Sequence, residues 1–150
     1  MAKKLQLGYR EIEQRLAVSF SINGVNSAEV GYKLLYSFGK SERDIERYKE
    51  GKGVLKTFDG LLIKGLFCYR ASSTMQLTNV LERLKQDQQV LKAAPKIIAV
   101  SDGKSILAYD LREKDTYENQ LERLPSDFAF FYPLMDVERV HYVEESPADI

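Results

Sequence analysis

Residues 53–69 read GVLKTFDGLLIKGLFCY, and residues 95–110 read PKIIAVSDGKSILAYD. Each stretch holds two runs rich in β-branched, aromatic and other apolar residues, and Asp-Gly separates the two runs. Asp-Gly favours the type I′ turn of a two-residue β-hairpin, because that turn needs positive φ at both central residues. The pattern therefore predicts two hairpins. The first turns at Asp59-Gly60, between strands over 54–58 and 61–69. The second turns at Asp102-Gly103, between strands over 97–101 and 105–110.

A helix is expected between the two hairpins, over 79–91. This stretch contains no Gly or Pro, and its apolar stripe consists of Leu77, Leu81, Leu84 and Leu91. Ser73 or Thr74 can cap the start of the helix, and Pro95 ends it. A helix of this length can cross over a sheet, so the strands before and after it can lie parallel. The predicted fold is therefore α/β (α+β), a mixed sheet of four or more strands with a crossover helix on one face.

Three helical segments are predicted ahead of this sheet. The first has an apolar stripe formed by Leu5, Tyr9, Ile12 and Leu16. Asn26 and Glu29 resemble a capping box before a second helix, which Gly39 ends. Ser41 is expected to cap a third, short and highly charged helix that ends at Gly51.

The pattern after the second hairpin is less regular. Tyr117, Leu121 and Leu124 suggest a helix that Pro125 terminates. The residues over 128–134 form the densest aromatic cluster of the chain. The spacing of Val137, Val140 and Val143 fits a helix or a strand equally.

Composition indicates one globular domain over residues 1–150. Lys plus Arg and Asp plus Glu are 22 each, so the net charge is zero, which argues against broad electrostatic attachment to nucleic acid or membrane. Cys68 is the only cysteine, which excludes an internal disulfide and fits a reducing cytoplasm. No run approaches the roughly 20 apolar residues of a membrane span, and the start of the chain lacks the apolar centre of a secretion signal. We therefore expect a cytoplasmic protein with no membrane partner.

Two motifs that suggest catalysis have simpler interpretations. Gly103-Lys104-Ser105 looks like the end of a phosphate-binding P-loop, but Ile98 stands where that loop needs its first Gly, so a hairpin turn fits better. His141 is the only histidine, so the sequence offers few residues for a histidine-based metal site or catalytic triad.

The order of strands, helix and strands resembles the PD-(D/E)xK nuclease fold, which predicts a restriction-endonuclease-like architecture. In that family an acidic residue that opens a strand, and an acid-x-Lys about ten residues later, hold a divalent metal over a phosphate. Asp59 stands in the first place, and Cys68-Tyr69-Arg70 stands where acid-x-Lys is expected. A thiol is a poor ligand for Mg²⁺, and the pKa of Arg70 is too high for general acid–base work. Asp59, Cys68 and Arg70 are therefore degenerate candidates for a catalytic site, and no metal site is predicted.

More specifically, the chain from about residue 33 onward resembles the N-terminal segment of large bacterial type II restriction-modification DNA methyltransferases, the Eco57I and MmeI-like group. The resemblance lies in short motifs in a fixed order: 34–39 (LLYSFG), 62–64 (LIK), 98–103 (IAVSDG), 130–134 (FFYPL) and 144–149 (EESPAD). It implies that a methyltransferase domain follows in the parent chain, that this domain is a partner of the present one, and that S-adenosylmethionine binds there. No cofactor is expected in residues 1–150.

Three functions are open on this basis. The first is a nuclease-like domain that has lost cleavage and engages duplex DNA weakly, with phosphate contacts from Lys56, Lys64, Arg70, Ser73, Lys85 and Lys104. Ser72, Ser73 and Thr74 also open a helix, whose N-terminal amides favour anions. The second is a docking module that contacts the rest of its parent chain through the aromatic residues over 128–132. The third is an active metal-dependent endonuclease. Each of these functions has a simpler structural alternative. The lysines are then ordinary solvated surface residues, the aromatic residues belong to the core, and Asp59 is a turn residue.

Overall fold

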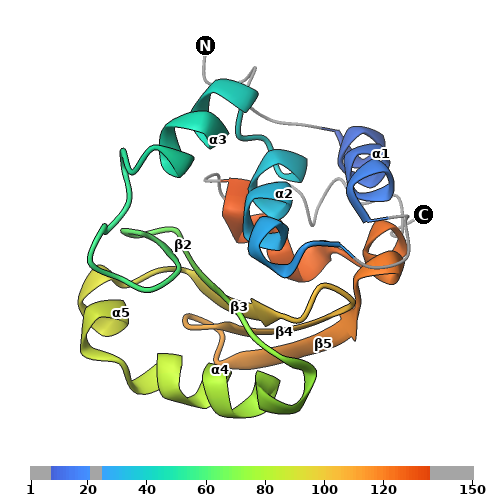
Figure 1. Ribbon diagram of the computed structural model, residues 1–150. Coiled ribbons are helices and arrows are strands. Elements are labelled where there is room, and N and C mark those ends of the chain that lie inside the picture. Colours follow the sequence, from blue (N-terminus) through green and yellow to red (C-terminus); the bar gives the residue numbers. More distant parts are fainter. Residues whose placement is uncertain (1–7, 21–24, 136–150) are drawn as a thin grey trace.

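The computed structural model describes residues 8–20 and 25–135, which form one five-stranded mixed sheet with helices on both faces (Figure 1). The strands are β1 (Leu61–Ile63), β2 (Phe67–Ala71), β3 (Ile97–Ser101), β4 (Ser105–Asp110) and β5 (Asp115–Gln120), and they lie side by side in sequence order. β2 and β3 are parallel, and the other neighbouring pairs are antiparallel. The predicted mixed sheet and its parallel central pair are confirmed.

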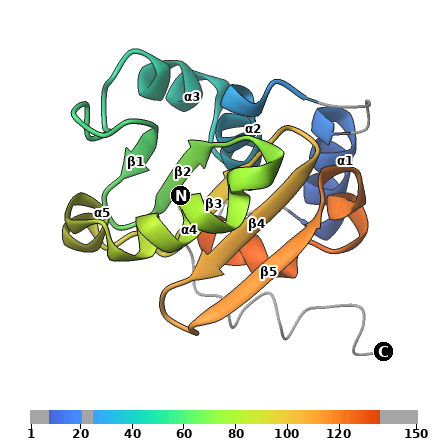
Figure 2. The ribbon, with the colours of Figure 1, turned by 60° about the horizontal axis from the view of Figure 1, so that its bottom comes forward.

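Helices α4 (Leu77–Gln86) and α5 (Gln88–Ala93) connect β2 to β3 and cover one face of the sheet (Figure 2). A short 3₁₀ turn, η3 (Thr74–Gln76), precedes α4. The predicted single helix is interrupted because the carboxylate of Asp87 accepts hydrogen bonds from the amides of Gln89 and Val90 and so caps α5. The break also rotates Leu91 away from the predicted apolar stripe, and its side chain is 47% exposed.

The other face of the sheet carries α1 (Tyr9–Phe20), α2 (Val30–Ser37), α3 (Glu42–Lys49) and three 3₁₀ segments (Figure 1). The 3₁₀ segments are η2 (Ser27–Glu29), η4 (Leu121–Ser126) and η5 (Ala129–Met135). The hydroxyl of Ser41 caps α3 at the amide of Asp44, as predicted. Leu5 and the valines at 137, 140 and 143 lie outside the described ranges.

Side chains of the central strands alternate between two cores. Phe67, Tyr69, Ile97 and Ala99 point into the larger core under α1, α2 and the 3₁₀ segments. Cys68, Ile98 and Val100 point into the smaller core under α4 and α5. Because both faces of β2 and β3 are buried, these strands read as continuous apolar runs with no polar alternation.

The first predicted hairpin is wrong in its position. Residues 54–58 form turns and no strand, and the stretch 61–69 folds into two strands that turn at Lys64–Leu66. Gly65 supplies the positive φ of that turn, at 72°. Gly60 lies just before β1, where a Cβ would meet the Tyr69 carbonyl at 2.6 Å. The unbroken apolar run hid the turn, since both strands are buried on both faces.

Two further predictions near the C-terminal end are also wrong. Tyr117 lies on β5, opposite Ala108, and not on a helix. Leu121 and Leu124 lie on η4, which contains Pro125. Pro125 is the fifth of the six residues of η4, so it lies inside this short 3₁₀ segment and does not end a helix before it.

The aromatic cluster after β5 is a core element. Phe128 is 2% exposed, Phe131 is fully buried and Tyr132 is 7% exposed. Phe131 packs edge-on against Tyr117 of β5, with ring centroids 5.3 Å apart. The expectation that the residues over 128–132 form a docking contact is therefore corrected, since Phe128, Phe131 and Tyr132 are buried inside the domain and Phe130 is half-buried against the same core.

The second hairpin forms at Asp102-Gly103, as predicted, with Ser101 paired to Ile106. The Asp102 carboxylate accepts hydrogen bonds from the amides of Lys104 and Ser105, both at 2.8 Å. Gly103 has φ of 96°, and its carbonyl accepts a 2.8 Å hydrogen bond from the Val25 amide. A Cβ at Gly103 would lie 2.2 Å from the Val25 carbonyl oxygen, so only glycine fits here.

Gly103→Ala should therefore lower the free energy of unfolding by about 2 kcal/mol or more, because it combines an unfavourable φ with a backbone clash. Urea unfolding followed by circular dichroism measures the loss. Gly65→Ala is a matched control with positive φ but open space around the Cβ, and it should cost only about 1 kcal/mol. Equal losses in the two variants would show that the clash with Val25 does not exist.

Candidate functional site

The residues that resemble a nuclease site lie at the end of the sheet where β2 finishes and β1 begins. A pocket of about 490 Å³ opens there between these strands, η2 and α3. Its wall includes Asp59, Gly60, Tyr69 and Arg70 from the sheet side, and Glu29, Tyr32 and Lys49 from the helix side. Sequence reasoning placed Asp59 and Arg70 near one another, and the structure brings them together at this pocket.

Arg70 is held in a defined orientation. Its Nε donates a 2.7 Å hydrogen bond to the Asp59 carbonyl oxygen, and its guanidinium carbon lies 4.7 Å from the centre of the Phe58 ring. The two terminal nitrogens make no hydrogen bond or ion pair within the described part of the chain. An arginine with one nitrogen anchored and a stacked plane presents a preformed fork that suits a phosphate or a carboxylate.

Cys68 does not belong to this pocket. Its neighbours on β2 face one core, whereas its own side chain points into the other core, beside Leu62, Leu81 and Ile98. The thiol is fully buried, and desolvation raises its pKa to about 12, although the positive charge of Arg70 acts in the opposite direction. A neutral thiol that is buried in this core cannot join Asp59 in holding a cation.

Asp102 lies at the same end of the sheet and serves the hairpin. Its carboxylate accepts hydrogen bonds from the amides of Ser105 and Lys104 and from the hydroxyl of Thr74. Partial desolvation raises the pKa of Asp102, but these hydrogen bonds outweigh that effect and hold the pKa below its ordinary value. The carboxylate is therefore a fixed structural acceptor that joins the start of the crossover to the β3–β4 turn.

The residues predicted to contact DNA are divided by the fold. Arg70, Ser73 and Lys104 lie at the carboxyl ends of β2 and β3. Lys64 lies in the β1–β2 turn, at the opposite end of the sheet. Lys85 lies on α4, where it pairs with Glu82 at 3.1 Å and covers the Tyr109 ring at 4.1 Å. Lys56 is exposed in the loop before β1. Ser73 precedes η3 and makes no side-chain cap.

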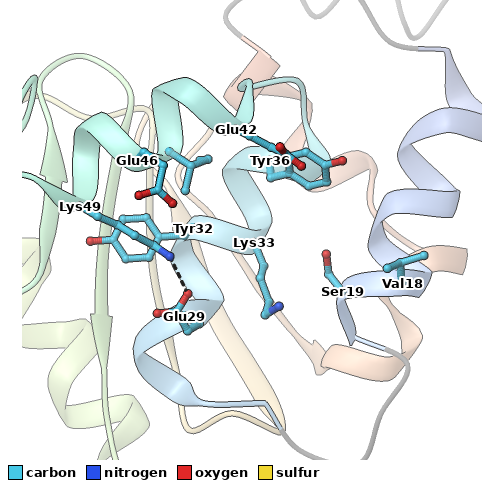
Figure 3. Close-up of a pocket in the computed structure, with 10 residues that line it drawn as sticks. Val18, Ser19, Glu29, Tyr32, Lys33, Tyr36, Glu42, Glu46 and Lys49 are labelled. Atoms are coloured by element: carbon cyan, nitrogen blue, oxygen red, sulfur yellow. Dashed lines mark hydrogen bonds and ion pairs between the residues drawn. The ribbon is translucent and has the colours of Figure 1, made fainter.

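A second pocket, of about 550 Å³, continues along the groove between α2 and α3 (Figure 3). Both pockets are lined by Glu29, Tyr32 and Lys49, so these three residues form the boundary between them. Lys49 pairs with Glu29 at 3.1 Å and lies 5.1 Å from the centre of the Tyr32 ring. Desolvation raises the pKa of Tyr32, and Lys49 partly opposes it.

Sequence reasoning missed this groove because its walls come from segments that are 20 residues apart and share no motif. In residues 8–20 and 25–135, no three His, Cys, Asp or Glu side chains are grouped closely enough to hold a metal ion. Within the same ranges no helix has the length and apolarity of a membrane span.

The position of Cys68 predicts slow reaction with a thiol reagent in the native protein. Labelling by a maleimide should be at least about a hundredfold slower than after denaturation, because the thiol must first be exposed by opening of α4 from the sheet and then ionise. Mass spectrometry over time measures the rate. Tyr109→Cys, at a half-exposed position on β4, is the control that should react quickly. Rapid native labelling of Cys68 would place its sulfur at the surface.

Comparisons with known proteins show the family of this chain. Residues 11–150 match the family described as MmeI, N-terminal domain. The chain is 26% identical over 130 residues to DNA methyltransferase A of Bacillus subtilis (strain 168). The aligned region covers 86% of this chain but only 15% of that protein. No solved structure matches significantly. Because the family match extends over nearly all of the sequence, this chain belongs to the family of MmeI N-terminal domains.

Proposed function

We propose that this chain is the N-terminal domain of a longer restriction-modification DNA methyltransferase, and that it helps the parent protein engage duplex DNA without cutting it. The family and the relative named DNA methyltransferase A support the first part. The chain spans about 15% of the length of that relative, which leaves room for a downstream methyltransferase domain. S-adenosylmethionine would bind in that downstream domain.

The observation that carries the non-cleaving role is the separation of the three positions that resemble nuclease ligands. Asp59 is exposed at the pocket, whereas the Cys68 thiol is buried in the core under α4 and α5. Arg70 lies at the pocket, but a guanidinium neither coordinates a cation nor accepts a proton from water. Metal-dependent phosphodiester hydrolysis needs converging carboxylates and a group that orients the attacking water. Two carboxylates line the pocket, those of Asp59 and Glu29, and Glu29 is already paired with Lys49 at 3.1 Å.

The role in DNA engagement is supported by the groups that remain available at the carboxyl ends of β2 and β3. The terminal nitrogens of Arg70 point outward from a stacked, anchored guanidinium, and the ammonium group of Lys104 is exposed on the hairpin turn. The hydroxyl of Ser73 is exposed at the start of the crossover. Such groups contact phosphates and set the orientation of a protein on a duplex without reading its sequence.

The docking alternative loses its proposed contact, since Phe128, Phe131 and Tyr132 are buried within the domain. Binding that does not weaken with added salt would nevertheless favour an apolar contact with the rest of the parent protein over phosphate binding.

The purified chain should not nick supercoiled plasmid DNA in Mg²⁺ or Mn²⁺, because the other carboxylate that lines the pocket of Asp59, that of Glu29, is paired with Lys49. Gel electrophoresis of the plasmid after incubation measures nicking, and Asp59→Ala is the matched control. Nicking that requires metal and disappears in the control would establish an active nuclease and refute the non-cleaving role.

Arg70→Gln should weaken binding of duplex DNA and lower the slope of log K against log salt by about 0.9, the contribution of one phosphate contact. Fluorescence anisotropy with a labelled duplex across a salt series gives the slope. Arg10→Gln removes one exposed charge from α1, far from the site, and should leave the slope unchanged. If the chain binds no DNA at low salt, the DNA-engaging role is wrong.

A further inference from the structure

The end of the sheet opposite the candidate site brings four segments together. The Gly65 amide, in the β1–β2 turn, donates a 2.8 Å hydrogen bond to the Ala93 carbonyl at the end of α5. The Lys96 amide, just before β3, donates to the Leu66 carbonyl at 2.9 Å. The Leu111 amide, after β4, donates to the Lys96 carbonyl at 3.1 Å. These backbone bonds hold the two turns, α5 and the start of β3 as one rigid edge, which we call the amino end because β2 and β3 begin there.

Every one of these segments contributes a cation to the amino end. The cations are Lys64 in the β1–β2 turn, Lys92 on α5, Lys96 before β3, and Arg112 and Lys114 in the β4–β5 turn. All are exposed except Lys96, which is half-buried. Within the described ranges, the four exposed cations form no ion pair with an acidic side chain. Figure 1 shows α5 and the β4–β5 turn at the same end of the sheet.

The acidic residues nearby do not neutralise this edge. Asp110 is 2% exposed, and its carboxylate accepts hydrogen bonds from the amides of Arg112 and Glu113, so it shapes the turn from inside. Glu113 and Asp115 are the exposed acids that the turn itself carries, against four exposed cations on the edge. At the carboxyl end, by contrast, Arg70 and Lys104 are balanced by Asp59 and Asp102.

Charge is also distributed unevenly along the sequence, which the net charge of zero hides. Between Lys52 and Lys104 the chain carries nine Lys and Arg residues and four Asp and Glu residues. From Ser105 to Met135 it carries three Lys and Arg residues and six Asp and Glu residues. The segment that forms the crossover layer and the central strands is therefore basic, and the segment that follows is acidic. A local excess of cations attracts a polyanion even when the whole chain is neutral.

We propose that the amino end is a second phosphate-binding surface of this domain, and that its partner is the backbone of duplex DNA. This inference rests on the proposed role in DNA engagement and deepens it. Exposed lysine and arginine side chains spread over four segments suit a row of phosphates better than a single small anion, which would need converging donors in a pocket. A protein partner would need an apolar centre to its contact, and the only large apolar side chain exposed beside these cations in the described structure is Leu91.

The geometry allows one duplex to reach both ends of the domain. β2 and β3 are five residues long, so the carboxyl and amino ends are separated by roughly 17 Å, which is about half a helical turn of DNA. α4 and α5 run between the two ends across the same face (Figure 2). DNA placed along this layer contacts Arg70 and Lys104 at one end and the four exposed cations at the other.

The test compares two triple variants of the whole chain that lose the same charge. Lys64→Gln/Lys92→Gln/Arg112→Gln removes cations from the amino end, and Lys40→Gln/Arg43→Gln/Arg47→Gln removes them from α3 and the turn before it. Anisotropy with a labelled duplex of about 20 base pairs gives the affinity and the salt slope. The amino-end variant should bind about tenfold more weakly at low salt, with a slope lower by about 2 to 3, because each lost phosphate contact removes roughly 0.9. The α3 variant should stay within about twofold of the wild type, and thermal unfolding should show that both variants fold.

The two proposals fail in different ways. If the wild type binds DNA with salt dependence and the amino-end variant binds like the α3 variant, the amino-end surface is wrong while DNA engagement stands. If the wild type binds no DNA, engagement is wrong and the amino-end surface falls with it. If the amino-end variant binds weakly but an equal loss appears in the α3 variant, the effect is one of total charge, and the assignment to this surface is refuted.

Discussion

The parallel pairing of β2 with β3 is the constraint on which the rest of this structure depends. Parallel strands cannot be joined by a tight turn, so the chain must leave the carboxyl end of β2, cross one face through α4 and α5, and return to the amino end of β3. That crossover buries one side of both strands under the helices, and the N-terminal helices and the 3₁₀ segments bury the other. The domain thus acquires two cores, two unlike ends and a single layer that connects them.

This arrangement explains why residues that are close in the sequence have different environments. Cys68 and Arg70 both lie on β2, two residues apart, but Cys68 is sealed beneath α4 while Arg70 reaches the edge and turns its guanidinium over Phe58. A nuclease arrangement requires its second carboxylate and its lysine to emerge together beside the first carboxylate. Here the strand presents a thiol to the core and an arginine to the pocket, which is consistent with a domain that holds DNA and leaves the chemistry to another part of its parent protein.

The electrostatic organisation follows from the same topology. The crossover segment and the central strands carry the excess of lysine and arginine, and the fold gathers their turns at the amino end through backbone hydrogen bonds. At the carboxyl end, by contrast, acids and bases balance, and Asp102 is committed to the hairpin that Gly103 permits. A neutral chain can therefore present one face and edge to a polyanion, with association that depends strongly on salt.

Local patterns in the sequence determined the mixed sheet, the crossover, the Asp102-Gly103 hairpin and the Ser41 cap, because each rests on turn chemistry, capping or the spacing of apolar residues. Tertiary structure decided the rest. The turn at Gly65 was hidden because strands buried on both faces lack a polar alternation that would mark their ends. Tyr117 lies on a strand, and the residues over 128–132 pack around it and around Phe38. No local spacing in the sequence encodes these contacts. Lys64, Lys92, Lys96, Arg112 and Lys114 are spread over 50 positions of the sequence, and only the backbone contacts of the folded sheet bring those charges to one edge.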